Sequence, residues 1–179
     1  MHFLNYFYTK TLKFDLINKF YYTDLKKLPK LKKVILNFSC KTTELKTLAT
    51  HLLALELITV QKGILTVSKR PNLLLKIRKG NPTGCKLTLK KTSILNFLSK
   101  SINEIFPKIK NFDGLSVHQK IEKTTFSFVI KDTLNFSELT ENYYLFNNLS
   151  HLSLSFVAAV KEKEEMLFLL KSLQLPLKK

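Results

Sequence analysis

The stretch KIRKGNPTGCKLTLK, residues 76–90, holds the residue types that could most readily do chemistry in this chain. It contains two of the four glycines, five cations and no acid. Glycines let a main chain approach a ligand closely, and cations neutralise phosphate charge. The stretch therefore indicates phosphate recognition, either of a bound nucleotide or of a nucleic-acid backbone.

A nucleotide-binding P-loop is the first alternative, and the stretch does not fit one. In a P-loop the lysine is followed by a Ser or Thr that reaches the metal ion. Here Gly80 and Gly84 are one residue too close, and Leu87 follows Lys86. The pattern that follows also predicts a strand where a P-loop leads into a helix. We therefore predict no nucleotide site here.

Potential catalytic and metal-binding groups are scattered along the chain. Cys85 could be an activated thiol, but no base or orienting group lies near it, so we interpret it as a small residue at the start of a strand. The histidines form no i,i+4 pair; they are His2, His51, His118 and His151. We predict a protein that is not an enzyme and that uses no cofactor or metal ion.

The net charge of the chain limits the classes of partner that it can bind. Its 179 residues carry 30 Lys+Arg against 13 Asp+Glu, a formal net charge of +17, with an ordinary apolar content of 45%. Such a chain folds, and its field favours polyanions: nucleic acid first, an anionic membrane surface second. Only Arg70 and Arg78 are arginines, and the excess of Lys, Phe, Asn and Ile indicates an AT-rich genome of the organelle type.

Neither disulfides nor membrane insertion is expected. Cys40 and Cys85 give no metal-ligand spacing and no disulfide framework, which predicts free thiols in a reducing compartment. The longest apolar stretch, HLLALELITV, is short and contains Glu56, so we expect no membrane span. The beginning, MHFLNYFYTKTLKF, has the pattern of neither a signal peptide nor a transit peptide.

The hydrophobic pattern predicts alternating helices and strands. Period-two alternation places Val34, Leu36 and Phe38 on one face of a strand. The predicted elements are a helix at 5–20, a basic turn around Pro29, a strand at 32–39, a helix at 43–57, strands at 63–67 and 84–90 joined by a long loop at 68–83, a helix at 92–107, strands at 124–130 and 151–157, and a helix at 161–173.

Apolar stripes and terminal residues give finer expectations for the helices. In the helix 43–57 we expect a buried stripe of Leu45, Leu48, Leu52 and Leu55 or Leu57. In the helix 92–107 we expect Thr92 or Ser93 as the N-cap, Ile94, Leu98, Ile102 and Ile105 on one face, and Pro107 as the stop. In the helix 5–20 the apolar positions are Phe7, Leu12, Leu16 and Phe20.

The six elements from the strand 32–39 to the strand 124–130 follow the order β-α-β-β-α-β. This order predicts an α+β, ferredoxin-like fold. This split βαβ arrangement places helices on one face of an antiparallel sheet and leaves the other face open. We expect residues 1–179 to form a single domain, in which 1–30 are an N-terminal helix and basic turn and 31–179 an α+β core. The open face then collects polar residues: Lys33, Asn37, Lys86, Thr88, Lys90, Thr125, Ser127, Ser153 and Ser155.

The loop 68–83 is interpreted as a phosphate-contacting arm around an apolar patch at residues 73–75. Loops of this length in compact domains tend to be functional, although a solvated loop in a lysine-rich chain is the alternative. On the open sheet face, Asn37, Thr88 and nearby Gln61 could hydrogen-bond sugar, phosphate or base edges. An RNA recognition motif would place aromatic residues there, and its signature is absent. The pattern therefore favours shape and backbone contacts to folded RNA.

Three stretches closely resemble one family: VQKGILTVSKRPNLLLKIRKGNPTGCKLTLK (60–90), FPKIKNFDGLS (106–116) and the ending LQLPLKK. They are similar to the universal large-subunit ribosomal protein L five family, the 5S rRNA-binding proteins of the central protuberance. The similarity runs almost without gaps from Phe20 to Lys179, with a small insertion around 140–150.

The resemblance implies a structural constituent of the large ribosomal subunit. It implies that the sheet face and adjoining segments hold 5S rRNA, with Asn37, Gln61 and Thr88 at family positions for that contact. The 5S rRNA-binding residues we expect are Lys33, Asn37, Gln61, Lys62, Lys86, Thr88 and Lys90. The loop 68–83 corresponds to a family loop that extends toward the P-site tRNA, which implies a tRNA-facing set of Lys69, Arg70, Lys76, Arg78 and Lys79.

Further partners follow from the same resemblance. They are large-subunit rRNA, a small-subunit head protein at an intersubunit bridge, and other central protuberance proteins, with no membrane partner. The chain departs from the family in three places, one of which is Gly63, where a proline is common. A glycine-rich segment is replaced by KIEKTTFS (120–127), and Asp113 stands in FDGLS where the family has a cation. An acid there would repel phosphate.

Other functional classes remain open at the level of sequence. A free-standing basic RNA-binding or RNA-chaperone protein would have the same composition. A peripheral membrane protein would need an amphipathic helix with a basic polar face, and the last helix begins with acids. The composition and the expected absence of a targeting peptide predict an organelle-encoded protein of the mitochondrial matrix ribosome, with a plastid or the bacterial cytoplasm as alternatives.

Overall fold

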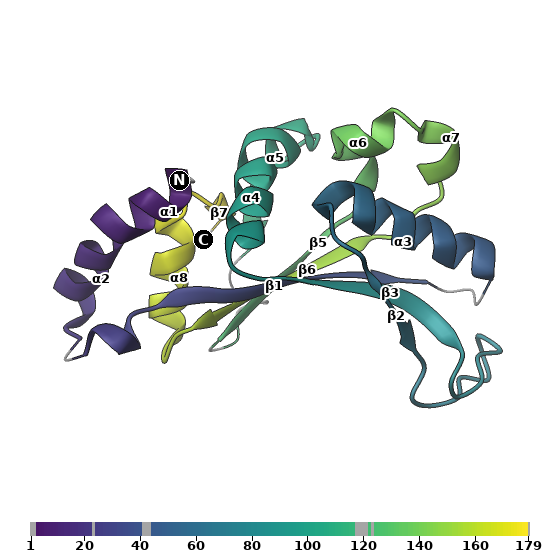
Figure 1. Ribbon diagram of the computed structural model, residues 1–179, viewed down its shortest axis with the longest axis horizontal. Helices are drawn as coiled ribbons and strands as arrows, with labels where there is room; N and C mark the ends of the chain where they lie inside the picture. Colours follow the sequence, from purple (N-terminus) through teal and green to yellow (C-terminus); the bar gives the residue numbers. More distant parts are fainter. Residues whose placement is uncertain (1–2, 23, 41–43, 117–121, 123, 179) are drawn as a thin grey trace. The chain divides into compact units, whose positions relative to one another are not determined.

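The computed structural model describes residues 3–22, 24–40, 44–116, 122 and 124–178 of the chain (Figure 1). Within these residues the helices are too short or too polar to cross a lipid bilayer.

Helices and strands follow the predicted order, with additional short elements. The helical elements are α1 (Phe3–Phe7), the π-helical turn η1 (Tyr8–Leu12), α2 (Lys13–Phe20), η2 (Leu25–Lys27), α3 (Leu45–Thr59), α4 (Thr92–Lys100), the π-helical turn η3 (Ser101–Ile105), α5 (Phe106–Lys108), η4 (Thr133–Asn135), α6 (Ser137–Thr140), α7 (Tyr143–Phe146) and α8 (Lys163–Ser172). The strands are β1 (Lys30–Ser39), β2 (Ile64–Val67), β3 (Pro82–Leu89), β4 (Leu115–Ser116), β5 (Thr125–Ile130), β6 (Leu152–Ala159) and β7 (Leu177–Lys178).

The main sheet is five-stranded and antiparallel, with the order β2-β3-β1-β6-β5, and β4 pairs with β7 in a separate two-stranded sheet. This order confirms the predicted α+β, ferredoxin-like fold class. In the first split βαβ unit, β3 lies between β1 and β2. In the second, β1 lies between β3 and β6. The strand that completes the motif is therefore β6 at 152–159, and β5 at 125–130 is an added edge strand.

The chain divides into two compact units. The first comprises Met1–Val34, Leu89–Phe128 and Ser155–Lys179, and the second Ile35–Thr88 and Val129–Leu154. The unit boundaries fall inside β1, β3, β5 and β6. The expectation of a single domain at 1–179 stays a prediction.

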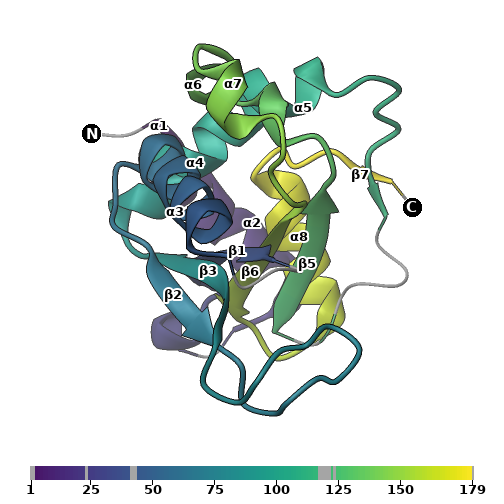
Figure 2. The same cartoon turned by 90° about the vertical axis from the view of Figure 1, so that its right-hand side faces the viewer.

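In the second unit, α3, α6 and α7 lie on the same side of the strands (Figures 1 and 2). The side chains of Phe38, Leu55 and Phe136 are fully buried in this core. His51 of α3 is also buried: its Nδ1 donates to the Thr47 carbonyl at 2.5 Å, and its Nε2 accepts from the Ser150 amide at 2.9 Å. The imidazole joins α3 to the segment before β6, a structural role that the sequence did not reveal.

Gly84 allows β3 to lie close to β1 within the second unit. A Cβ atom at this position would approach the Phe38 carbonyl oxygen to 2.5 Å and the Thr66 hydroxyl to 3.1 Å. Real Cβ atoms do not come that close to a backbone oxygen, so any other residue would push the strands apart.

In the first unit, the N-terminal helical segment packs on α8. The rings of Phe20 and Phe168 meet edge to face at 5.8 Å, and Lys19 Nζ lies 4.4 Å from the centre of the Phe168 ring. The Tyr8 hydroxyl donates to the Pro29 carbonyl at 2.8 Å, which fixes the same segment to the residue before β1. Leu12 and Leu16 are buried as expected, while Phe7 and Phe20 are half-buried.

Three details of the helices differ from the expectation. Leu45 is exposed and Leu52 half-buried, because the buried face of α3 consists of Leu48, His51, Ala54, Leu55 and Ile58; of the alternatives Leu55 and Leu57, Leu55 is the buried one. The N-cap of α4 is Lys91, and no side chain caps this helix; Thr92 and Ser93 are its first helical residues. Pro107 lies inside the last turn, α5, instead of stopping the helix before it.

Candidate nucleic-acid interface

The outer side of β1 carries Asn37 in the second unit. Its neighbours Leu36 and Phe38 are fully buried, whereas Asn37 and Ile35 are half-buried. The alternation leaves the Asn37 amide accessible on the side away from the core. In the first unit, Lys33 occupies the same half-buried side of the strand.

The outer side of β3 carries Lys86 and Thr88. Lys86 is exposed and Thr88 half-buried, while Cys85, Leu87 and Leu89 face the core. Lys86 pairs with Ile64 of β2 in the antiparallel register. Lys90, in the first unit, is exposed immediately after the strand ends.

Gln61 and Lys62 lie at the junction between α3 and β2 in the second unit. The helix ends at Thr59, and its C-cap Val60 has a left-handed backbone with φ 57°; the Val60 amide donates to the Glu56 carbonyl at 2.7 Å. The chain therefore turns sharply before it enters β2. Lys62 is exposed and Gln61 half-buried at this turn.

The structure thus brings five of the seven predicted 5S rRNA-binding residues into one compact unit. These are Asn37, Gln61, Lys62, Lys86 and Thr88, whereas Lys33 and Lys90 belong to the other unit. The strand residues of the second unit at 35–39, 64–67 and 82–88 contain no acid. Nothing on these strand segments would repel a phosphate, and amide and hydroxyl groups are available to fix its position.

The predicted loop is an ordered arm, which we define as residues 68–81. At its base the Ser68 amide donates to the Asn81 carbonyl at 2.8 Å, and the Gly80 amide to the Ser68 carbonyl at 2.9 Å. Further out, Asn72 and Ile77 exchange two backbone hydrogen bonds of 2.8 and 2.9 Å. β3 begins at Pro82, so the predicted loop boundary at 83 is two residues too late.

The tip of the arm is turned by Asn72. Its side-chain oxygen accepts from the amides of Leu74 and Leu75 at 3.1 and 3.4 Å, a local turn that Asn favours. Leu73 and Leu74 are 93% and 95% exposed. The five predicted tRNA-facing cations are all exposed along this arm: Lys69, Arg70, Lys76, Arg78 and Lys79. The arm therefore presents a cationic surface with an apolar tip.

Asp113, predicted to repel phosphate, has a cationic neighbour. Its carboxylate accepts from Lys178 Nζ at 3.1 Å, and both side chains are exposed. An exposed pair of this kind adds little stability, but it offsets the local negative charge. Of the altered segment 120–127, residues 120, 121 and 123 lie outside the described residues; Thr125 donates its hydroxyl to the Glu122 carboxylate at 2.9 Å.

The described residues give no sign of an active site. Cys85 is fully buried, its Sγ contacts the Leu48 carbonyl at 3.5 Å, and burial raises its pKa to about 11, with the neighbouring Cys40 adding to the shift. No group of three His, Cys, Asp or Glu side chains among the described residues could hold a metal ion.

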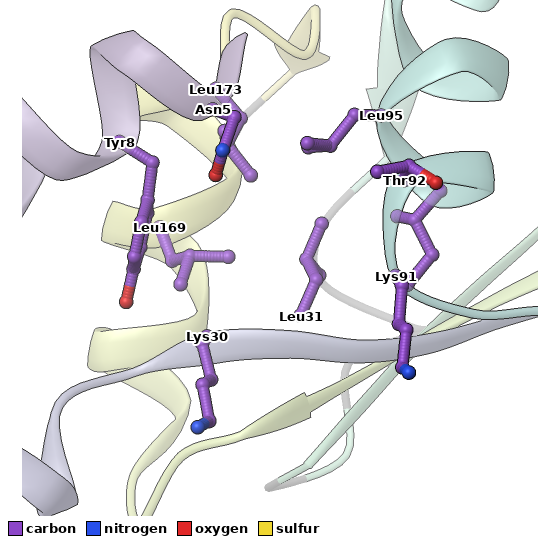
Figure 3. A pocket seen from close by; sticks show the side chains of 10 residues that line it. Asn5, Tyr8, Lys30, Leu31, Lys91, Thr92, Leu95, Leu169 and Leu173 are labelled. Carbon is purple, nitrogen blue, oxygen red and sulfur yellow. The ribbon is translucent and has the colours of Figure 1, made fainter. Parts of the chain in front are cut away.

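A cavity of about 290 Å³ lies in the first unit (Figure 3). Its lining holds no histidine, cysteine or carboxylate, and the side chains of Leu31, Leu95 and Leu169 point toward its centre.

One set of exposed residues was not predicted. The N-terminal helical segment exposes the aromatic side chains of Phe3, Tyr6 and Phe14. The sequence signal was present, because these residues recur at helical spacing on the side opposite Leu12 and Leu16.

The comparisons with known proteins show the family of the chain. Residues 82–177 match the family model that describes the C-terminus of the ribosomal L5 protein family. The chain is 36% identical over 174 residues to the large ribosomal subunit protein uL5m of Reclinomonas americana, which covers 96% of each chain. It is 33% identical over 171 residues to uL5 of Malacoplasma penetrans, covering 94% of this chain and 90% of that one. It is 34% identical over 163 residues to uL5 of Ruminiclostridium cellulolyticum, covering 90% and 89%. The chain therefore belongs to the ribosomal protein uL5 family, a structural, non-enzymatic family of the large ribosomal subunit.

Proposed function

We propose that the chain docks 5S rRNA in the central protuberance of the large ribosomal subunit through the outer side of its strands. The observation that carries the proposal is the acid-free strand surface of the second unit, with Asn37 and Thr88 half-buried and Lys86 exposed. Lysines release counterions from phosphates and supply affinity. Half-buried amide and hydroxyl groups have restricted rotamers, so they set the register of the RNA.

The arm supports a second contact, to the P-site tRNA. Its cations reach away from the strands on a backbone held at its base and at the Asn72–Ile77 bridge. A narrow cationic arm with exposed leucines at its tip suits the grooved backbone of a folded RNA. Lys69, Arg70, Lys76, Arg78 and Lys79 are its proposed tRNA-facing residues, and contacts to large-subunit rRNA complete the RNA partners.

Contacts to basic protein partners are favoured on a surface that is not itself cationic. Residues 132–149, which we call the acidic segment, contain Asp132, Glu138 and Glu141 and no Lys or Arg. This composition supports contacts to basic ribosomal proteins, including the small-subunit head protein of the proposed intersubunit bridge and neighbours in the central protuberance.

The proposed location is the mitochondrial matrix ribosome, with an organelle-encoded gene. The similarity to a mitochondrial relative and the lysine-rich composition support this location. Bacterial relatives are nearly as identical to the chain as the mitochondrial one, so the bacterial cytoplasm is an alternative location. By analogy, a plastid is another.

The 5S rRNA site is tested by the double variant Asn37→Ala/Thr88→Ala. Two lost hydrogen bonds to RNA should weaken 5S rRNA binding by tenfold or more, at roughly 1 kcal/mol each. Thermal stability should change little, because both side chains lie on the outer side. The matched control is Thr50→Ala, a half-buried polar residue of α3 in the same unit, which should leave 5S rRNA binding unchanged. Unchanged 5S rRNA affinity of the double variant at several salt concentrations would refute the site.

A free-standing RNA chaperone is the second candidate function, favoured only by the net charge. Sedimentation in high salt separates the two. A ribosomal protein stays with the large subunit, whereas a chaperone held by charge alone is released.

A further inference from the structure

The N-terminal helical segment, residues 3–20, presents aromatic side chains to solvent. Phe3, Tyr6 and Phe14 are 70%, 53% and 60% exposed. Together with exposed Lys10 they follow the chain at intervals of three, four and four residues. Residues at these intervals lie one above another on a helix, so the four side chains form one line, which we call the aromatic line.

The aromatic line lies on a rigid support. Leu4, Leu12 and Leu16 are buried on the opposite side of the segment. Its middle is tied to the chain before β1 by the Tyr8–Pro29 hydrogen bond, and its end to α8 by the Phe20–Phe168 contact. The backbone that carries the aromatic rings is therefore held in place and loses little freedom when the rings bind a partner.

The charges along the same segment favour a nucleic acid as the partner. Lys10, Lys13 and Lys19 accompany the rings, and Asp15 is the only acid between residues 3 and 20. Aromatic side chains interleaved with lysines suit unpaired nucleotides, since rings stack on bases while ammonium groups neutralise phosphates. A bilayer surface fits less well, because the aliphatic side chains are turned into the protein and polar Thr11, Asp15 and Asn18 share the exposed side.

We propose that the aromatic line, Phe3, Tyr6, Lys10 and Phe14, is a second RNA-contact surface that stacks unpaired bases of large-subunit rRNA. The inference rests on the proposed function for the presence of RNA, but it uses residues of the first unit only and none of the 5S rRNA-binding set. The proposed 5S rRNA-binding residues contact the backbone of folded RNA. The aromatic line instead binds unpaired nucleotides.

The absence of tryptophan makes a direct test available. In a Tyr6→Trp variant the indole becomes the single tryptophan of the protein, and a 12-nucleotide oligo(U) should quench its fluorescence at elevated salt. A duplex of the same length should quench it far less. Tyr144→Trp is the matched control, because Tyr144 is 94% exposed but lies in the acidic segment; its fluorescence should not change.

Affinity measurements complete the test. Tyr6→Ser/Phe14→Ser should weaken oligo(U) binding on the order of tenfold or more, as expected for two lost base–aromatic stacks, and should leave 5S rRNA binding unchanged. Asn37→Ala/Thr88→Ala should do the reverse, so failure of this proposal is distinguishable from failure of the proposed function. Unaltered oligo(U) affinity in the serine variant would overturn the inference. So would a Tyr6→Trp signal that responds to phosphatidylglycerol vesicles and not to oligo(U).

Discussion

The arm and the acidic segment belong to the same compact unit, yet they differ in charge and in what holds them. The arm, residues 68–81, has five cations and no acid, and its one buried side chain is Ile77. The acidic segment, residues 132–149, has three acids and no cation, and it buries Phe136, Leu139 and Phe146 almost completely. In Figures 1 and 2 the arm lies on the other side of the strands from α6 and α7.

This difference separates two kinds of surface. The arm is held mainly by backbone hydrogen bonds, so it can change conformation without opening the core. The acidic segment is held by aromatic side chains in the core and moves only if the core is disrupted. A cationic arm that is held outside the core suits a large polyanion, and an acidic surface fixed on the core suits a protein partner.

The largest effect should come from the anchor of the acidic segment. Phe146→Ala removes a ring that is 1% exposed and should lower the free energy of unfolding by about 3–5 kcal/mol. Ile77→Ala, at the arm, should lower it by about 2 kcal/mol, the low end of the range for such changes, because Ile77 is 7% exposed and is the one buried side chain of the arm. Urea unfolding measures both. Tyr144→Ala is the exposed neighbour control, and equal losses at positions 77 and 146 would contradict the comparison.

An intermediate effect should follow from removing charge on the arm. Arg78→Ala/Lys79→Ala should spare 5S rRNA binding but weaken tRNA binding by about tenfold and lower the salt slope by about two, since two phosphate contacts are lost. Translation should fall accordingly.

The matched change on the other surface is Asp132→Asn/Glu141→Gln, which also removes two exposed charges. It should not weaken tRNA binding. A 5S rRNA affinity that drops as far in the arm variant as in Asn37→Ala/Thr88→Ala would show that the arm and the strand surface are not separate sites.

The smallest effect concerns Cys85, on the strand that leads out of the arm. Its raised pKa, about 11 against an ordinary 9.0, means that the folded state holds the thiol proton more tightly. The resulting stability is present below pH 9 and is lost as the pH rises from 9 to 11. At pH 8, alkylation of Cys85 should be slow in the native protein and fast in urea. The arm variant Arg78→Ala/Lys79→Ala should not change this protection; faster alkylation would show that the arm and the core open together.

Sequence patterns predicted the strand surfaces well. Period-two alternation in residues 34–38 gave the buried positions Val34, Leu36 and Phe38, which the structure confirms, because one face of the strand must be covered. Helix faces were predicted less well. Leu45 was expected to be buried, but it is exposed, and α3 buries His51 and Ala54, which were not predicted. The reason is long-range: the His51 imidazole meets Ser150, 99 positions along the chain.

The sequence by itself determined the class of partner, the fold class and the charge of each segment, since these depend on residue types and on short-range periodicity. The tertiary structure decided that β6 completes the sheet motif and that five of the seven predicted 5S rRNA-binding residues share one unit. It also decided that the arm is ordered by backbone hydrogen bonds, and that the aromatic line faces solvent. These outcomes depend on which distant segments compete for the same buried surface, and no local pattern records that competition.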